Sequence, residues 1–175
     1  MNEAKIAADK RRTKKMLSVL IPATVIMIIL AVLAGIYANK AGNKTAVSGD
    51  KFVNIITNAD FKVYDIMGEL EEENIFKSAY AVEHENGDFT YFLEFEKKGN
   101  AKSYFASVAR NFKTEVNEAG IDNSDSKDYE NYCYYTATVN GKYLHIVRVK
   151  NTVLYAEVSE DNMKSVQTIV NKIKY

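Results

Sequence analysis

Few side chains in this sequence could do covalent or metal chemistry: one cysteine and two histidines among 175 residues. A cysteine nucleophile needs a histidine base close to it, and His145 is the only candidate partner for Cys133. Pairing Val139 with Lys142 in a predicted hairpin places Cys133 opposite about residue 148. Cys133 also shares the apolar face of its strand, so we interpret it as a buried structural residue.

Metal-ligand patterns are equally sparse. His84 lies between Glu83 and Glu85, and no third ligand follows at a useful spacing for either histidine. The run 122–128 is similar to a calcium loop, but it lacks the central glycine and the distal glutamate, which favours a solvated connector. The acidic run 69–73 is typical of a solvated face, with contact to a basic partner or a cation as the alternative.

Sequence motifs for catalysis are also missing. The chain has no phosphate-binding loop, no nucleophile elbow, no His-Glu-x-x-His and no Cys-x-x-Cys. We therefore assign no catalytic residue, no cofactor and no metal ligand, and we expect a protein that is not an enzyme.

Tyrosines are concentrated on one predicted hairpin. In an extended strand Tyr132 and Tyr134 share one face, and Tyr135 lies on the opposite face. Either packed helices cover both faces, or an exposed row of tyrosines marks a binding surface, as aromatic residues do at interfaces and glycan sites. The candidate binding surface is Tyr132, Tyr134 and Tyr143.

The elements that position these residues follow from periodicity. Three- and four-residue apolar spacing predicts helices over 50–58, over 100–119 with Gly120 as the C-cap, and from about Glu160 to the C-terminus. Asn86-Gly87 and Asn140-Gly141, each between alternating apolar runs, predict two tight hairpins. The predicted strands are Phe61–Ile66, Ser78–Glu85, Asp88–Glu96, Tyr129–Val139, Lys142–Val149 and Thr152–Val158.

These elements predict an α+β domain. We expect an antiparallel sheet of about five to six strands with about three helices packed on one face. At a shift of 62 residues four identities recur, each at a strand-then-helix junction, which indicates a duplicated helix-plus-hairpin unit or a coincidence. The matched residues are Thr90, Asn100, Lys102 and Ser103 with Thr152, Asn162, Lys164 and Ser165.

A membrane span precedes this domain. Residues 16–38 carry no charge, and a helix of this length, at about 1.5 Å per residue, exceeds the roughly 30 Å of a bilayer core. Residues 1–15 hold six basic and two acidic side chains, which predicts a cytoplasmic N-terminus and an extracellular domain. The run is longer than a signal-peptide core, so an uncleaved anchor is favoured over a cleaved one. Leu33-Ala34-Gly35-Ile36 is similar to a lipobox whose cysteine is replaced by isoleucine, so lipid cannot be the anchor.

The charge balance reflects this layout. The formal net charge is zero, but the basic excess lies in 1–15 and an equal acidic excess lies beyond residue 38. We divide the chain into a cytoplasmic tail (1–15), a transmembrane helix (16–38), a linker (39–49) and an extracytoplasmic domain (50–175). An acidic domain of this kind excludes nucleic-acid binding through a basic patch.

Three motifs carry a family resemblance: strand-Asn-Ala-Lys-helix at 94–105, Asn-Gly-Lys-Tyr with Asn-Thr-x-x-Tyr at 140–155, and a terminal Lys-x-Tyr at 172–175. With the N-terminal span, they resemble an uncharacterised family of small membrane-anchored or lipoprotein extracytoplasmic domains from clostridial-type Gram-positive bacteria. The resemblance supplies no catalytic residue. Relatives often carry a zinc ribbon or a lipobox, and this chain has neither, so no metal or lipid carries over.

The sequence therefore predicts a single-pass protein of the cell membrane that presents a non-enzymatic binding domain outside the cytoplasm. Its partners would be the bilayer, through residues 16–38, and a protein or cell-wall polymer. The alternative is a structural subunit of a larger secretion, conjugation or division complex. Exchange of residues 16–38 for an unrelated span separates the two, because only the subunit depends on specific contacts of its span.

Overall fold

The computed structural model of the chain describes residues 30–32, 43–71, 73–120 and 123–175. The chain divides into two compact units, Met1–Ala41 and Gly42–Tyr175. The predicted tail and nearly all of the predicted span lie outside the described residues, apart from residues 30–32, which are helical. No helix within the described ranges combines the length and the apolar character needed to cross a bilayer.

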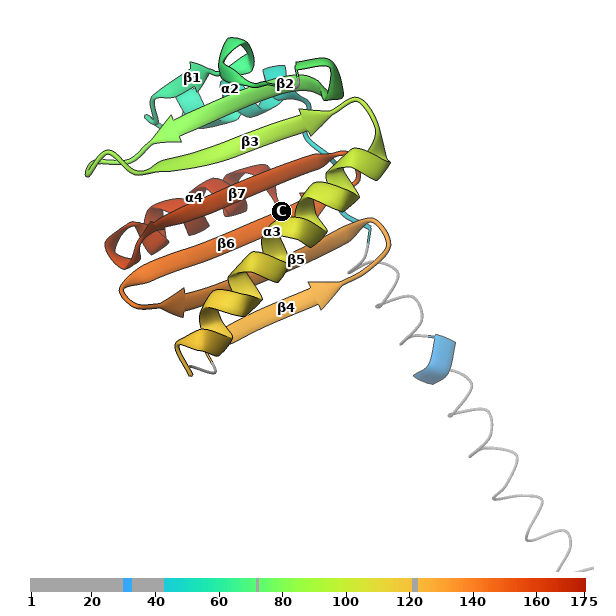
Figure 1. Cartoon of the computed structure of the whole chain (residues 1–175). Helices are drawn as coiled ribbons and strands as arrows, with labels where there is room; N and C mark the ends of the chain where they lie inside the picture. The colour runs from blue at the N-terminus through green and yellow to red at the C-terminus, as the bar shows by residue number, and fades with distance from the viewer. Residues whose placement is uncertain (1–29, 33–42, 72, 121–122) are drawn as a thin grey trace, which may run out of the picture. The chain divides into compact units, whose positions relative to one another are not determined.

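The second unit is built on one antiparallel sheet, whose seven strands in the described residues have the order β1-β2-β3-β7-β6-β5-β4 (Figure 1). The predicted α+β class is confirmed, and both predicted hairpins are present. The strands are β1 (Val63–Asp65), β2 (Phe76–Glu83), β3 (Phe89–Phe95), β4 (Ser124–Asp128), β5 (Tyr132–Val139), β6 (Lys142–Val149) and β7 (Thr152–Ser159).

Helices cover both faces of the sheet. Figure 1 shows α3 (Lys98–Glu118) crossing one face, with α2 (Gly49–Thr57) and α4 (Met163–Ile173) on the other. The prediction that the helices pack on one face is therefore wrong. The cause lies in the central strands: every residue of β6 after its first is buried, and an apolar surface on each side of the sheet needs its own cover. We call the two sides the α3 face and the α2/α4 face.

β4 is the strand that the sequence did not predict. All five of its residues are exposed and polar, so neither hydrophobicity nor alternation distinguishes them from the solvated connector expected at 122–128. β4 pairs with β5 at one edge of the sheet, and the chain then returns strand by strand until β7 pairs with β3. A short, charged edge strand also discourages pairing with other chains.

The two Asn-Gly turns differ in conformation. Asn140 and Gly141 both have positive φ, 51° and 76°, as a type I′ turn requires. In the β2–β3 hairpin, of the two turn residues only Gly87 has a positive φ, and the loop is longer than two residues. The Asn140-Gly141 turn sets the β5–β6 register and pairs Cys133 with Arg148, as predicted.

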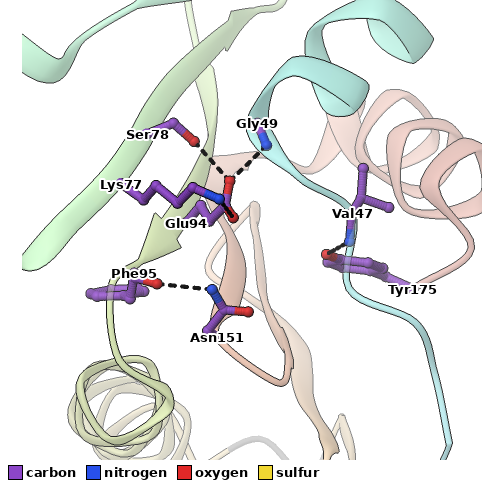
Figure 2. A network of polar contacts seen from close by, with 8 residues as sticks. All are labelled: Val47, Gly49, Lys77, Ser78, Glu94, Phe95, Asn151 and Tyr175. Atoms are coloured by element: carbon purple, nitrogen blue, oxygen red, sulfur yellow. Dashed lines mark hydrogen bonds and ion pairs between the residues drawn. The ribbon is translucent and has the colours of Figure 1, made fainter.

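The segment before α2 belongs to the domain core. The amide of Val47 donates to the hydroxyl of the C-terminal Tyr175 at 2.8 Å (Figure 2). Both residues are buried. The domain thus begins before Asp50, inside the segment 39–49 that the sequence marks as a flexible linker.

Glu94 fixes the start of α2. Its buried carboxylate accepts the amide of Gly49 at 2.8 Å and pairs with Lys77 at 3.1 Å (Figure 2). A Cβ at position 49 would lie 2.1 Å from the hydroxyl oxygen of Ser78, so only glycine fits there without a shift. A carboxylate at the first turn also complements the helix dipole.

The two strand-then-helix junctions of the suggested repeat do not lead to the same place. α3 follows β3 onto one face, whereas α4 follows β7 onto the other. The two junctions are therefore not copies of one three-dimensional unit.

Candidate functional site

A groove lies on the α3 face, over β1, β2 and β3. It consists of two adjacent hollows of about 330 Å³ and 230 Å³, whose linings share Ile66 and Tyr91. We call it the aromatic groove. Its first hollow is acidic and its second is apolar. The other lining residues are Tyr64, Asp65, Glu69, Ala81, Glu83 and Phe89 in the first hollow and Leu70, Phe76, Leu93, Tyr104 and Tyr155 in the second.

Stacked rings make the floor of the groove rigid. The ring of Tyr91 lies on that of Tyr155 with centroids 5.9 Å apart, and Tyr155 in turn stacks on the buried Phe112 of α3 at 5.8 Å. Burial raises the pKa of Tyr155 and of Tyr104, so both hydroxyls stay neutral. The apolar hollow thus offers ring faces and neutral hydroxyl groups to a ligand.

The acidic hollow carries charge at neutral pH. The hydroxyl of Tyr64 donates to the carboxylate of Glu83 at 2.7 Å, and this hydrogen bond, together with nearby Lys62, lowers the pKa of Glu83. Glu69 lines the same hollow, so its carboxylates outnumber its cationic neighbour, whereas Asp65 pairs with Tyr80 and lies on the opposite strand face. The end of the groove near β1 is therefore suited to a positively charged group.

The sequence missed this groove. β3 places Phe89, Tyr91, Leu93 and Phe95 on one face, and this row is the available signal. Only the topology shows that α3 leaves part of the row uncovered. The sequence instead predicted a binding surface at the cluster of tyrosines on the β5–β6 hairpin.

Tyr132, Tyr134 and Tyr143 do not form the exposed row predicted as a binding surface. Tyr132 and Tyr143 are 9% and 4% exposed, and Tyr134 is half-buried with its hydroxyl donating to Asp125 at 2.6 Å. Tyr132 is covered by Lys44, whose amino group lies 4.7 Å from the ring centre, and Tyr143 packs in a cluster with α4. The interpretation in which packed elements cover this face is the one the structure supports.

Cys133 is buried on the α3 face and faces Arg148, whose Nε donates to the sulfur at 3.2 Å. Burial raises the pKa of the thiol, which opposes formation of a nucleophilic thiolate. His145 pairs with Thr136, a residue of the opposite strand parity, so it points to the other face of the sheet. Cys133 and His145 therefore do not form a catalytic pair.

Both histidines are buried. The two ring nitrogens of His84 lie 2.9 Å and 2.8 Å from the hydroxyls of Ser165 and Thr90. Burial lowers the pKa of His145 to about 4, and its Nε2 has no hydrogen-bond partner among the described residues. In the described ranges, no three His, Cys, Asp or Glu side chains are grouped as metal ligands.

Comparisons with known proteins give little beyond this geometry. No protein-family model matches the chain, and no curated protein matches it. Among solved structures, it is similar to a GTP-binding regulator from Thermotoga maritima at 17% identity, over 73% of this chain and 84% of that one, with a TM-score of 0.39. This distant likeness carries no argument about a ligand.

Proposed function

We propose that this protein is a single-pass membrane protein whose α+β domain, outside the cytoplasmic membrane, is a non-enzymatic binding module with the aromatic groove as its ligand site. The observation that carries the proposal is the groove itself, which places a carboxylate-lined hollow beside an apolar one. The anchor is supported by the uncharged run 16–38 and its basic flank.

The occupant we propose is a polypeptide segment that carries basic and apolar side chains. Charge complementarity favours a lysine or arginine at the hollow lined by Glu69 and Glu83. The rings of Tyr91, Tyr104 and Tyr155 favour an aliphatic or aromatic side chain in the second hollow. Two adjacent hollows with opposite preferences fit the side chains of residues i and i+2 of one extended segment, because these two side chains point the same way.

Binding is tested with the full-length protein in detergent micelles and a capped Lys-Lys-Phe-Phe peptide, in which each side of the extended chain carries one lysine and one phenylalanine. We expect saturable binding that Tyr91→Ala weakens about fivefold or more, because this ring is common to both hollows. Glu83→Gln should weaken it less, and the matched control Asp161→Asn, at an exposed site in the turn before α4, should leave it within about twofold.

A capped Glu-Glu-Phe-Phe peptide decides whether the acidic hollow selects charge. It should bind at least about tenfold more weakly than the basic peptide. Equal binding of the two peptides, or basic-peptide binding that survives Tyr91→Ala, would place the ligand outside the groove and refute the proposed site.

The topology is tested by cysteine labelling of intact cells. A membrane-impermeant maleimide should label Thr45→Cys, which lies at an exposed position, and should label Thr13→Cys only after lysis. The unmodified chain is the control, since Cys133 is 2% exposed and should stay unlabelled while the domain is folded. Labelling of Thr13→Cys in intact cells would reverse the proposed orientation.

A further inference from the structure

A second pocket lies on the α3 face, on the opposite side of α3 from the aromatic groove. It has a volume of about 330 Å³ and is lined by α3 and by the strands β4, β5 and β6. We call it the basic pocket. Four of its lining residues are cationic, Lys102, Arg110, Lys113 and Arg148, and one, Asp128, is acidic.

Arg148 is the central feature of the basic pocket. It is 1% exposed, and its guanidinium donates to the sulfur of Cys133, to the carbonyl oxygen of Lys150 at 3.1 Å and to that of Glu130 at 3.0 Å. A guanidinium has five N–H donors. These contacts use three of them, and none of the acceptors is an anion.

Among the described residues Arg148 therefore forms no ion pair, and the one acidic residue of the lining, Asp128, lies two strands away. The ion pairs of the described residues include neither Arg148 nor any of the other charged groups that line the basic pocket. Burying an ion without a counter-charge costs several kcal/mol. A bound anion would offset that cost, and Lys102, Arg110 and Lys113 on α3 would add to its attraction.

The rest of the lining indicates the shape of the ligand. Phe105, Ala106 and Ala109 form an apolar wall between the cationic side chains of α3. The volume exceeds that of a single inorganic ion and is at the lower end of small-molecule sites. An acid with an apolar body therefore fits better than a bare ion.

We propose that the basic pocket binds a small organic acid, with its phosphate or carboxylate group on Arg148 and its apolar part against Phe105 and Ala109. Arg148 supplies a planar set of donors suited to either group. Lys102 and Lys113 supply charge at the mouth of the pocket. This site is independent of the aromatic groove and does not rest on the function proposed for it.

The test uses the full-length protein in detergent micelles, with phenyl phosphate, benzoate and inorganic phosphate as probes. Binding is followed by the NMR resonance of the Arg148 Nε–H, assigned with Arg148→Lys. We expect a saturable shift with phenyl phosphate or benzoate, at least about threefold tighter for phenyl phosphate than for inorganic phosphate. Comparison of phenyl phosphate with benzoate identifies the preferred acid group.

Variants at exposed positions keep the test independent of folding. Replacing Lys102 and Lys113 together by Gln should weaken phenyl phosphate binding about fivefold to tenfold, and Asp128→Asn should strengthen it at least about twofold. The matched control replaces Lys51 and Lys172, which are exposed on α2 and α4, by Gln. It should change the affinity for phenyl phosphate by less than about twofold.

Three results would overturn the proposal. The first is an Arg148 resonance that none of the probes moves. The second is an equal loss of affinity in the pocket variant and the control variant, since binding would then follow overall charge. The third is a shift with phosphatidylglycerol vesicles but with none of the free probes, since the ligand would then be a lipid headgroup.

Discussion

The two faces of the sheet are covered in different ways. On the α2/α4 face, α2 and α4 contact each other, and fully buried residues such as Phe52, Phe92 and Leu154 fill the core. On the α3 face α3, with 21 residues, is the one α-helix among the described residues, and the segments 66–71 and 73–75 cover only the end of the sheet near β1 and β2. A helix is about 10 Å wide, and seven strands at about 4.8 Å spacing span nearly three times that width. The face with one helix therefore keeps open surface on both sides of it, and the aromatic groove and the basic pocket lie there.

Because of this difference, the α2/α4 face contributes mainly to stability, whereas the α3 face also offers open surface for binding. Residues of the α2/α4 face serve the core, whereas several residues of the α3 face are only partly covered and line hollows. The strands pass through both environments at alternating positions. Neighbouring residues of one strand should therefore differ sharply in what their removal costs.

Tyr91 and Phe92 of β3 give the largest expected contrast. Phe92 is fully buried and stacks on Phe52 with ring centroids 4.2 Å apart, whereas Tyr91 is half-buried in the aromatic groove. Phe92→Ala should lower the free energy of unfolding by about 3–5 kcal/mol, and Tyr91→Ala by about 1 kcal/mol. Urea unfolding of a fragment with residues 43–175, which covers nearly all of the second unit, measures both.

A larger loss of stability in Tyr91→Ala than in Phe92→Ala would contradict this contrast between the two faces, because the groove would then be part of the core. Leu93→Ala is a useful third variant, because Leu93 lines the groove but is only 4% exposed. Its cost should fall between the other two.

The α2/α4 face should also make stability depend on pH. Burial lowers the pKa of His145 to about 4, below its ordinary value of 6.5. As the pH falls from 6.5 toward 4, the unfolded chain binds a proton that the folded chain does not, so stability is full above pH 6.5 and declines below it. Between pH 7 and pH 4.5 this histidine should account for a loss of about 2–3 kcal/mol.

His145→Gln is the variant that checks this assignment. Its unfolding free energy should fall less than that of the unmodified domain over the same pH range. Burial also lowers the pKa of His84, so His84→Gln should reduce the decline too, but by a smaller amount because that ring is less buried and its nitrogens have hydroxyl partners. An unchanged decline in His145→Gln would mean that other groups control the acid sensitivity.

Local patterns were enough to predict most of the elements. The apolar spacing that ends at Gly120 predicts α3 within two residues of its observed bounds, and Asn140-Gly141 predicts the β5–β6 hairpin and its register. Both signals arise from contacts or dihedral angles close in sequence. β4 escaped prediction because its residues, all polar and exposed, depend on pairing with β5 and not on their own propensity.

The sequence did not show which helices and which side chains lie on each face of the sheet. Alternation shows that a strand has two faces, but it does not show which helix covers each of them. For this reason the sequence left open whether Tyr132 is exposed or buried, although a covered face was favoured. The aromatic groove and the basic pocket follow from where α3 crosses the sheet. Arg148 was not singled out, because its burial depends on α3, on β5 and on the carbonyl of Glu130.

The smallest expected contrast compares one hydroxyl on each face. The hydroxyl of Tyr175 accepts a hydrogen bond from the amide of Val47 at 2.8 Å (Figure 2). It also contacts the hydroxyl of Thr152, and all three residues are buried. The hydroxyl of Tyr155, beside the groove, donates to the partly exposed Glu157 at 3.2 Å. Tyr175→Phe leaves a buried amide unpaired and should cost about 1–2 kcal/mol, whereas Tyr155→Phe should cost less than about 0.5 kcal/mol because water can replace it. Urea unfolding of both variants in the 43–175 fragment measures the difference. Equal costs would show that the buried hydrogen bonds of Tyr175 stabilise the domain no more than the exposed one of Tyr155. The two faces would then differ in how helices cover them, but not in how strictly their polar groups are paired.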